Sequence, residues 1–191
     1  MDLTYLKPAS YVVTQLEKAY QPFPSPTEKT EDCALAVSQY LQEKGVTTPG
    51  ILAVATEKQT GDVYVAFSAG LLSGLNAKFP ARTGGYGGKR GYDAVEASLQ
   101  TYLQGKYGKT KLPSVVLCAT IQEAMARQCT RLSCAEPKIL SCLRQLGRKI
   151  SSLCVIGYLD YEQNGYDVIS SGKMTYLHPC RDCRNFGGNY L

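Results

Sequence analysis

Two short cysteine-containing motifs carry the chemistry of this 191-residue chain: Cys-Ala-Glu at residues 134–136 and Pro-Cys-Arg-Asp-Cys at residues 179–183. Residues three apart on a helix share a face, so Cys180 and Cys183 can hold one metal ion between them. Pro179 suits a first helical turn, and a helix N-terminus stabilises the thiolate form of cysteine. Alone, Cys-x-x-Cys also fits a redox pair, half of a structural zinc site or a disulfide.

The first motif adds a third thiolate and a carboxylate, which a catalytic metal site needs besides the Cys-x-x-Cys pair. Cys134 is expected at the start of a helix, where it provides a third thiolate. A zinc ion with three protein ligands keeps its fourth position for water and lowers the pKa of that water. Glu136 would lie close to the metal without having to bind it, and its carboxylate could move the water's protons to a substrate. The two motifs together predict a hydrolytic site with one Zn²⁺ per chain.

This arrangement resembles the zinc-dependent cytidine deaminase-like superfamily, whose signature is His/Cys-x-Glu followed by Pro-Cys-x-x-Cys. The resemblance implies that Cys134, Cys180 and Cys183 bind zinc, that Glu136 shuttles protons, and that a backbone N–H near Ala135 orients the substrate carbonyl. The sequence Cys-Ala-Glu-Pro-Lys is most similar to bacterial toxin-type and AID/APOBEC-like nucleic-acid deaminases. The fold that it implies is α/β: a three-layer α/β/α domain with a mixed central sheet, in which both motif helices point their N-termini at the metal.

The reaction implied by the resemblance is hydrolytic deamination of cytosine to uracil in single-stranded DNA or RNA, with the target base flipped or splayed into the pocket. Duplex DNA is a further substrate for toxin-type relatives. A free cytidine or nucleoside deaminase would use the same zinc site with a small closed pocket, and a guanine- or adenine-type enzyme also fits the motifs. The alternative from another class is a zinc-stabilised interaction domain without activity, in which Glu136→Ala would change nothing.

The sequence departs from the family pattern in two places. The interval between Glu136 and Cys180 is long and contains two strand-like pieces. The chain ends eight residues after Cys183, where many relatives continue with further strands. The early end favours a toxin-like architecture, for which an immunity protein would be a partner, whereas the leading segment from Met1 favours a free-standing protein.

Several of these residues also have plainer interpretations. Ser133 and Glu136 match a capping box. Cys129 could join the other three cysteines in a closed four-thiolate structural site, which would leave no position for water. His178, the only histidine, could touch substrate or phosphate, cap the final helix or lie in an exposed loop. The remaining cysteines fall in apolar patterns and are predicted to be small core residues: Cys33, Cys118, Cys142 and Cys154.

The positive charge of the chain is concentrated in one segment. The formal net charge is +5, and residues 81–111 contain six basic residues opposed by Asp93 and Glu96 alone. Such an excess can attract nucleic acid, and tyrosines among basic residues can stack on bases. The weak substrate-binding candidates in this segment are Arg82, Tyr86, Lys89 and Arg90. An ordinary solvated loop and helix end explain the same pattern.

The hydrophobic periodicity predicts an irregular segment over residues 1–30, followed by a single deaminase-like domain over residues 31–191. Helices are expected over 31–44 and 92–103, near 122–127, and from about 133 and 179. Strands are expected over 51–56, 62–68, 114–119, 153–159, 166–170 and 174–177. No stretch is long and apolar enough to span a bilayer, and no signal peptide is visible, so we expect a cytoplasmic protein or one delivered into a target cell, with no membrane partner.

Overall fold

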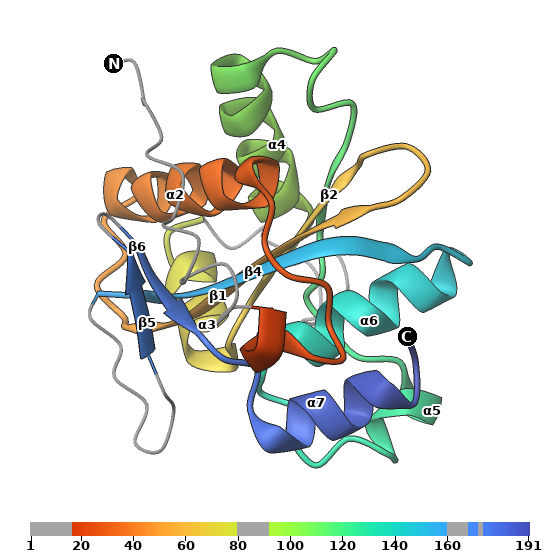
Figure 1. Cartoon of the computed structure of the whole chain (residues 1–191). Helices are drawn as coiled ribbons and strands as arrows, with labels where there is room; N and C mark the ends of the chain where they lie inside the picture. The colour runs from red at the N-terminus through yellow and green to blue at the C-terminus, as the bar shows by residue number, and fades with distance from the viewer. Residues whose placement is uncertain (1–16, 80–91, 160–167, 172–173) are drawn as a thin grey trace.

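The computed structural model describes residues 17–79, 92–159, 168–171 and 174–191, which contain one six-stranded sheet in the order β3-β2-β1-β4-β6-β5 (Figure 1). The strands are β1 (Gly50–Glu57), β2 (Val63–Phe67), β3 (Val115–Leu117), β4 (Ile150–Tyr158), β5 (Val168–Ser171) and β6 (Met174–Leu177). The helices are α2 (Glu28–Glu43), α3 (Ala69–Asn76), α4 (Asp93–Tyr107), α5 (Glu123–Ala126), α6 (Ala135–Gln145) and α7 (Arg181–Gly188).

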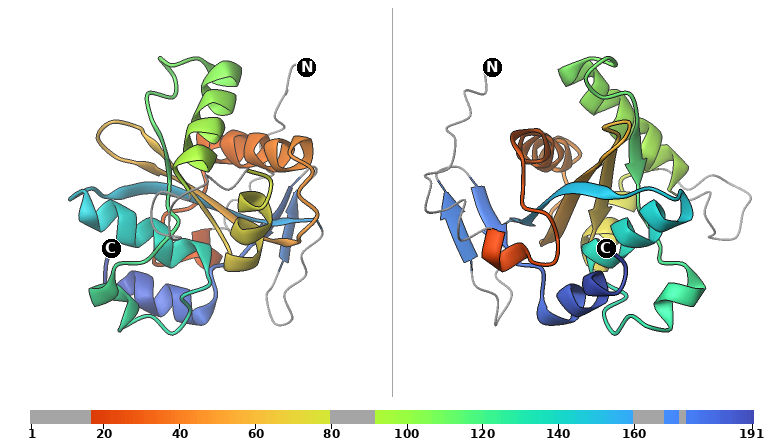
Figure 2. Two further views of the ribbon diagram at one scale, coloured as in Figure 1. Left: turned by 180° about the vertical axis from the view of Figure 1, so that it is seen from behind. Right: turned by 45° about the vertical axis from the view of Figure 1, so that its right-hand side comes forward.

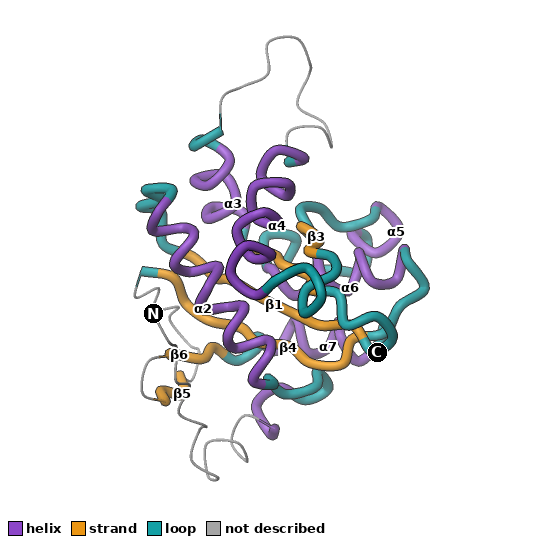
Figure 3. Tube along the Cα trace, turned by 90° about the horizontal axis from the view of Figure 1, so that it is seen from above, coloured by secondary structure: helices purple, strands orange, loops and turns teal. Residues whose placement is uncertain are grey.

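Helices cover both faces of the sheet, which confirms the predicted three-layer α/β/α architecture. Helices α2 and α4 lie on one face, where α2 packs on β1 and β4 (Figures 1 and 3). Helix α6 packs on β1 and β2 from the opposite side, and α7 lies beyond it and contacts it (Figures 1 and 2). Because β1 is covered on both faces, every one of its residues is buried, which explains its apolar run from Ile51 to Ala55.

The sheet is mixed, as the sequence predicted. Strands β2 and β3 pair in parallel, and the chain crosses between them through α3 and α4. The pairs β1–β2, β1–β4, β4–β6 and β5–β6 are antiparallel. This order places β3 and β4, the strands before and after α6 in the sequence, on opposite sides of β1, with β2 between β3 and β1. Helix α6 can therefore lie across β1 with its N-terminus held at a fixed place.

Some helix ends differ from the expected positions. Helix α2 begins at Glu28, because Thr27 and Thr30 form a reciprocal capping box that starts the helix one turn earlier than expected. It ends as predicted before Gly45, whose φ of +65° is the left-handed conformation that glycine adopts at this position. The final helix begins at Arg181 rather than at Pro179.

The segment that precedes α2 belongs to the folded unit. Ala19, Tyr20 and Phe23 are buried in the core. The Tyr20 hydroxyl donates to the carbonyl of Val155 at 3.2 Å and accepts from the N–H of the same residue at 3.0 Å. Strand β6 pairs with β4 at the neighbouring Ile156, so Tyr20 satisfies the adjacent peptide groups on that edge of β4. The packed domain therefore extends at least to Ala19, twelve residues before the boundary expected at residue 31.

Removing the Tyr20 hydroxyl should destabilise the whole domain. Tyr20→Phe leaves a buried N–H and a buried C=O of Val155 without partners, which costs about 1–3 kcal/mol. Urea denaturation followed by circular dichroism measures the loss. The matched control is Tyr102→Phe, because the Tyr102 hydroxyl bonds to the exposed Glu43 carboxylate and its loss should stay within about 0.5 kcal/mol. If Tyr20→Phe lowered the free energy of unfolding no more than the control does, residues 17–27 would not be part of the cooperative unit.

Candidate metal centre

Three cysteine sulfur atoms meet where the N-termini of α6 and α7 converge. Cys134 is the N-cap of α6, Cys180 is the N-cap of α7, and Cys183 lies in the first turn of α7. Their sulfur atoms all lie within 4.8 Å of one another. A tetrahedral zinc ion with Zn–S bonds of about 2.3 Å needs sulfur atoms about 3.8 Å apart. Because Cys134 and Cys183 are buried and Cys180 is half-buried, this cluster could hold one metal ion away from bulk solvent.

Both helix starts have the extended N-cap backbone that aims a side chain at the first turn. Cys134 has φ −73° and ψ 155°, and Cys180 has φ −62° and ψ 164°. The Cys180 sulfur accepts a hydrogen bond from the N–H of Cys183 at 3.3 Å. The helix dipoles and the N–H groups of both first turns, which have no partner within their helices, favour negative charge at the sulfur atoms. This confirms the expectation that two helix N-termini face the cysteine cluster.

The alternative interpretation of Ser133 and Glu136 as a capping box is wrong. The N-cap of α6 is Cys134, one residue later, and the Cys134 side chain makes no capping bond. Glu136 consequently occupies the second helical position instead of the third, and the N–H groups of Ala135 and of Glu136 itself donate to its carboxylate. The N-cap of α7 is likewise Cys180, so His178 does not cap that helix and instead lies half-buried between β6 and Pro179.

The neighbouring thiols and burial raise the pKa of Cys134 and of Cys183. The hydrogen bond with Cys180, together with burial and the nearby Glu136, raises the pKa of the Cys134 thiol to about 12, although the hydrogen bond with Cys183 acts in the opposite direction. Hydrogen bonds with Cys134 and Cys180, together with burial, raise the pKa of Cys183 well above its usual range. Three thiolates this close repel one another unless a cation lies between them. The cluster therefore gains most from a metal ion, which would release the thiol protons on binding.

Glu136 is the buried acid of the site. Its side chain is only 3% exposed, and its Oε2 atom has no hydrogen-bond partner among the described residues. Burial raises the pKa of this carboxyl to about 7, although the N–H groups of Glu136 and Ala135 oppose the rise. The N–H of Ala135 therefore stabilises the ionised form of the Glu136 carboxyl in this structure. A buried acceptor without a partner is costly, so the free oxygen indicates that a ligand or water completes the site.

Lys138 is a site residue that the sequence analysis missed. Its side chain is 4% exposed, and its Nζ donates to the carbonyl of Phe67, the last residue of β2, at 2.7 Å. Burial lowers the pKa of this amine, while nearby Cys134 and Glu136 act in the opposite direction. A zinc ion with three thiolates carries one net negative charge. A buried ammonium group on the same helix as Cys134 would therefore balance the charge of the site if it held zinc.

Aromatic and ionic contacts hold α7 against α6 and the segment before it. Arg131 and Asp182 form an ion pair at 2.9 Å, which ties the loop leading to Cys134 to the first turn of α7. The Arg144 guanidinium lies 4.6 Å from the centre of the Tyr190 ring. Gly187 faces Phe23 so closely that a Cβ atom there would lie 2.8 Å from the end of the ring. The two halves of the cysteine cluster are therefore fixed relative to each other.

Adding a methyl group at Gly187 should loosen this packing. In Gly187→Ala the new Cβ overlaps the buried Phe23 ring, and such overpacking costs about 1–3 kcal/mol. Thermal melting measures the effect. Gly188→Ala is the matched control, because its Cβ would meet Pro22 at 3.9 Å, an ordinary contact, and should be neutral. Phe23→Leu should restore part of the stability of Gly187→Ala; no destabilisation, or none relieved, would contradict this packing.

The closed four-thiolate site is not formed by the described residues. Cys129 is buried, and both burial and the charge of Cys180 raise the pKa of its thiol. Its sulfur, however, is not among the three that meet within 4.8 Å. No disulfide joins any of the eight cysteines, all of which lie in the described part of the chain. The cysteines predicted to be core residues are confirmed as such: Cys33, Cys118 and Cys154 are buried, and Cys142 packs against the core.

The basic segment contributes nothing to the cysteine cluster within the described residues. Arg82, Tyr86, Lys89 and Arg90 lie outside the described residues. The rest of the segment belongs largely to α4, which lies on the opposite face of the sheet from α6 and α7 (Figures 1 and 2). There the Tyr107 hydroxyl donates to the Asp32 carbonyl at 2.9 Å and so packs α4 against α2.

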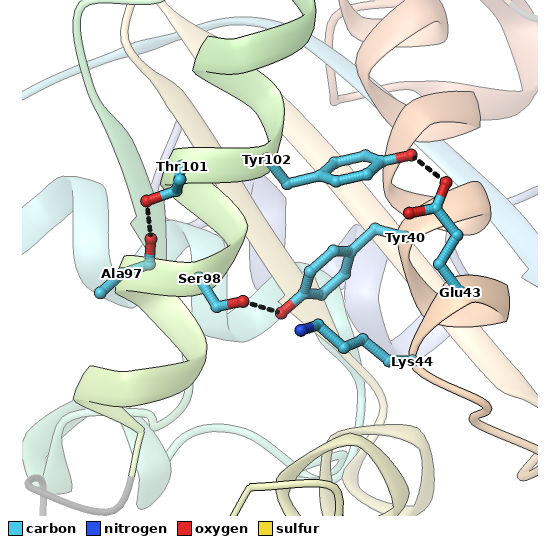
Figure 4. Close-up of a pocket in the computed structure, with 7 residues that line it drawn as sticks. All are labelled: Tyr40, Glu43, Lys44, Ala97, Ser98, Thr101 and Tyr102. Carbon is cyan, nitrogen blue, oxygen red and sulfur yellow. Dashed lines mark hydrogen bonds between the residues drawn. The ribbon is translucent and has the colours of Figure 1, made fainter.

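A hollow of about 510 Å³ lies on that opposite face, between α2 and α4 (Figure 4). Its polar side chains bond to one another. The Tyr102 hydroxyl donates to Glu43 at 3.0 Å, and the Tyr40 hydroxyl donates to Ser98 at 3.0 Å. The Lys44 ammonium stands 5.5 Å from the centre of the Tyr40 ring. Both tyrosine hydroxyls of this hollow thus already have partners, whereas Oε2 of Glu136 in the cysteine site has none among the described residues.

Within the described residues no helix is both long enough and apolar enough to cross a bilayer. In comparisons with known proteins, no protein-family model matches the chain, no curated protein matches it, and no solved structure matches its fold.

Proposed function

We propose that this protein is a zinc-dependent hydrolytic deaminase that converts cytosine to uracil in single-stranded nucleic acid. The observation that carries the proposal is the buried Oε2 atom of Glu136, which has no described partner and lies on the helix whose N-cap is a member of the three-sulfur cluster. A purely structural metal site has no use for a buried acid with a free oxygen. A hydrolytic site requires one.

The donor set favours zinc among the common metals. Thiolates are soft ligands that select zinc, copper(I) or iron–sulfur clusters, whereas magnesium and calcium take oxygen. Three protein ligands leave a fourth position open, and zinc bound there would make a water molecule nucleophilic near neutral pH. The described residues offer no fourth cysteine, histidine or carboxylate oxygen at the cluster, which would have favoured a closed site.

Glu136 moves the protons of the reaction. It takes one proton from the attacking water and delivers it to the ring nitrogen N3 while the water oxygen bonds to C4 of cytosine. It then carries the second proton to the exocyclic amino group. The C4–N bond breaks, ammonia leaves and uracil remains, so one water is consumed for each ammonia released. A carboxyl whose pKa lies at about 7 can both accept and return a proton at neutral pH.

A panel of substrates tests the proposal. Zinc-loaded protein is incubated with single-stranded DNA, single-stranded RNA, duplex DNA and free cytidine, and each product is scored by mass spectrometry. We expect uracil in a single-stranded substrate, with free cytidine converted more slowly. Conversion of cytidine alone would replace the proposal by a nucleoside deaminase. Bound zinc without conversion of any substrate would replace it by a zinc-stabilised interaction domain.

A further inference from the structure

A polar groove of about 610 Å³ runs along α7, the helix that carries two of the three cysteines. One wall is formed by Gln21 and Pro22, and the other by α7 residues that include Arg181, Arg184 and Asn185. The segment that holds residues 21 and 22 lies beside α7 in each ribbon view (Figures 1 and 2). The groove is widely open to solvent, so a ligand can enter it.

The periodicity of α7 links the groove to the metal centre. Cys180, Cys183 and Gly187 follow one another at spacings of three and four, and this side of the helix faces the cluster and the Phe23 ring. Arg181, Arg184 and Gly188 follow the same spacing one residue later, and this neighbouring side lines the groove. Each arginine directly follows a cluster cysteine in the sequence. A chain lying in the groove would therefore pass beside the metal centre.

The charge of the groove points to an anionic ligand. Its lining includes two guanidinium groups and no carboxylate. The three ion pairs within the described residues involve neither Arg181 nor Arg184. The Nε atom of Arg184 is buried and has no hydrogen-bond partner among the described residues. Arg184 as a whole is only half-buried, so a phosphate oxygen could accept charge-assisted hydrogen bonds from the accessible part of this guanidinium group.

We propose that this groove binds the phosphodiester backbone of a single-stranded nucleic acid, with Arg181 and Arg184 each contacting a phosphate. That this nucleic acid is the substrate rests on the proposed function. The nucleic acid would then bind along α7, beside the metal centre, and not on the basic segment 81–111. Successive phosphates of an extended strand are spaced closely enough for two arginines one helical turn apart to contact neighbouring phosphates.

Binding measurements on zinc-loaded protein test the groove without requiring turnover. Fluorescence anisotropy is recorded with a labelled oligonucleotide over a range of salt concentrations, for wild type and for the Arg181→Gln/Arg184→Gln double variant. We expect the double variant to bind at least about tenfold more weakly. The slope of log affinity against log salt should also fall by about 1.4, since each contact to a single strand contributes about 0.7. Arg181→Gln alone, at an exposed position, should show about half of the change in slope.

The matched control is Lys109→Gln/Lys111→Gln. It removes the same charge from two exposed positions in the turn after α4, on the opposite side of the molecule, and should bind like wild type. An equal loss in this control, or wild-type affinity and salt slope in the arginine variant, would overturn the groove. Arginine-dependent binding without deamination of any substrate would leave the groove standing and reject the proposed function. Deamination of an oligonucleotide whose affinity does not depend on either arginine would reject the groove and leave the proposed function standing.

Discussion

Replacing Glu136 by glutamine should abolish turnover while one zinc ion per chain remains bound. Glutamine has nearly the same shape, so the helix start and the cysteine cluster should be retained. Its amide cannot accept a proton from water or return one to the base, and loss of such a group typically costs about 10²–10⁴ in rate. The measurement is initial rate of uracil formation alongside the zinc content of the same sample. Because the unpartnered Oε2 atom is the main evidence for catalysis, no other substitution tests it as directly.

Glu123→Gln is the matched control for this experiment. Glu123 lies on α5, is exposed and pairs with Arg127, so its loss should leave both rate and zinc content unchanged. Wild-type turnover in Glu136→Gln would contradict the role of Glu136 as proton relay. Loss of zinc from that variant would contradict its position as a residue beside the metal rather than a ligand of it.

Replacing Cys183 by serine should remove the metal and a large part of the stability with it. Cys183 is 1% exposed and forms hydrogen bonds with both other cysteines. Serine is a weaker metal ligand, so its presence at this position should prevent the three side chains from holding one ion. Zinc that binds only the folded state stabilises it by about 4 kcal/mol at a thousand times its dissociation constant. Wild type should therefore melt at higher temperature as zinc is added, and Cys183→Ser should not respond. Zinc content per chain is measured in parallel.

Cys129→Ser separates an open site from a closed one. Cys129 is buried close to the cluster but is not one of its three sulfur atoms, so its replacement should keep one zinc ion per chain and the zinc-dependent rise in melting temperature. Loss of zinc from this variant, matching that of Cys183→Ser, would show that a fourth thiolate closes the site. A closed site has no position for water, and the catalytic proposal would then be wrong.

The local patterns of the sequence predicted the sheet and the three cysteines that lie together. Apolar runs with helical or strand spacing located most of the described elements, and the two motifs contain the three cysteines whose sulfur atoms meet, Cys134, Cys180 and Cys183. The place of each cysteine on its helix follows from local geometry, because Cys180 and Cys183 share one helical turn and each helix start fixes its own N-cap. The chain between the motifs can vary without disturbing these local relations.

Contacts between distant segments account for what the sequence analysis missed. Tyr20 bonds to Val155, 135 residues away, and no periodicity in a polar, proline-rich segment reveals such a partner. Lys138 looks like a surface residue of a helix, but its side chain reaches the end of β2 at Phe67. The groove along α7 exists only because residues 21 and 22 return beside that helix. The basic segment 81–111 was a substrate-binding candidate because an excess of charge can be counted along the sequence. The sequence alone does not distinguish two arginines that line a groove from two arginines on an ordinary solvated surface.

The most direct test of the account is the mass of a single-cytosine, single-stranded oligonucleotide after incubation with zinc-loaded protein in water labelled with heavy oxygen. If the site activates water for attack at C4, the cytosine is converted to uracil carrying one labelled oxygen, and ammonia appears in equal amount. An oligonucleotide of unchanged mass in the presence of fully zinc-loaded, folded protein would contradict hydrolytic deamination of this substrate.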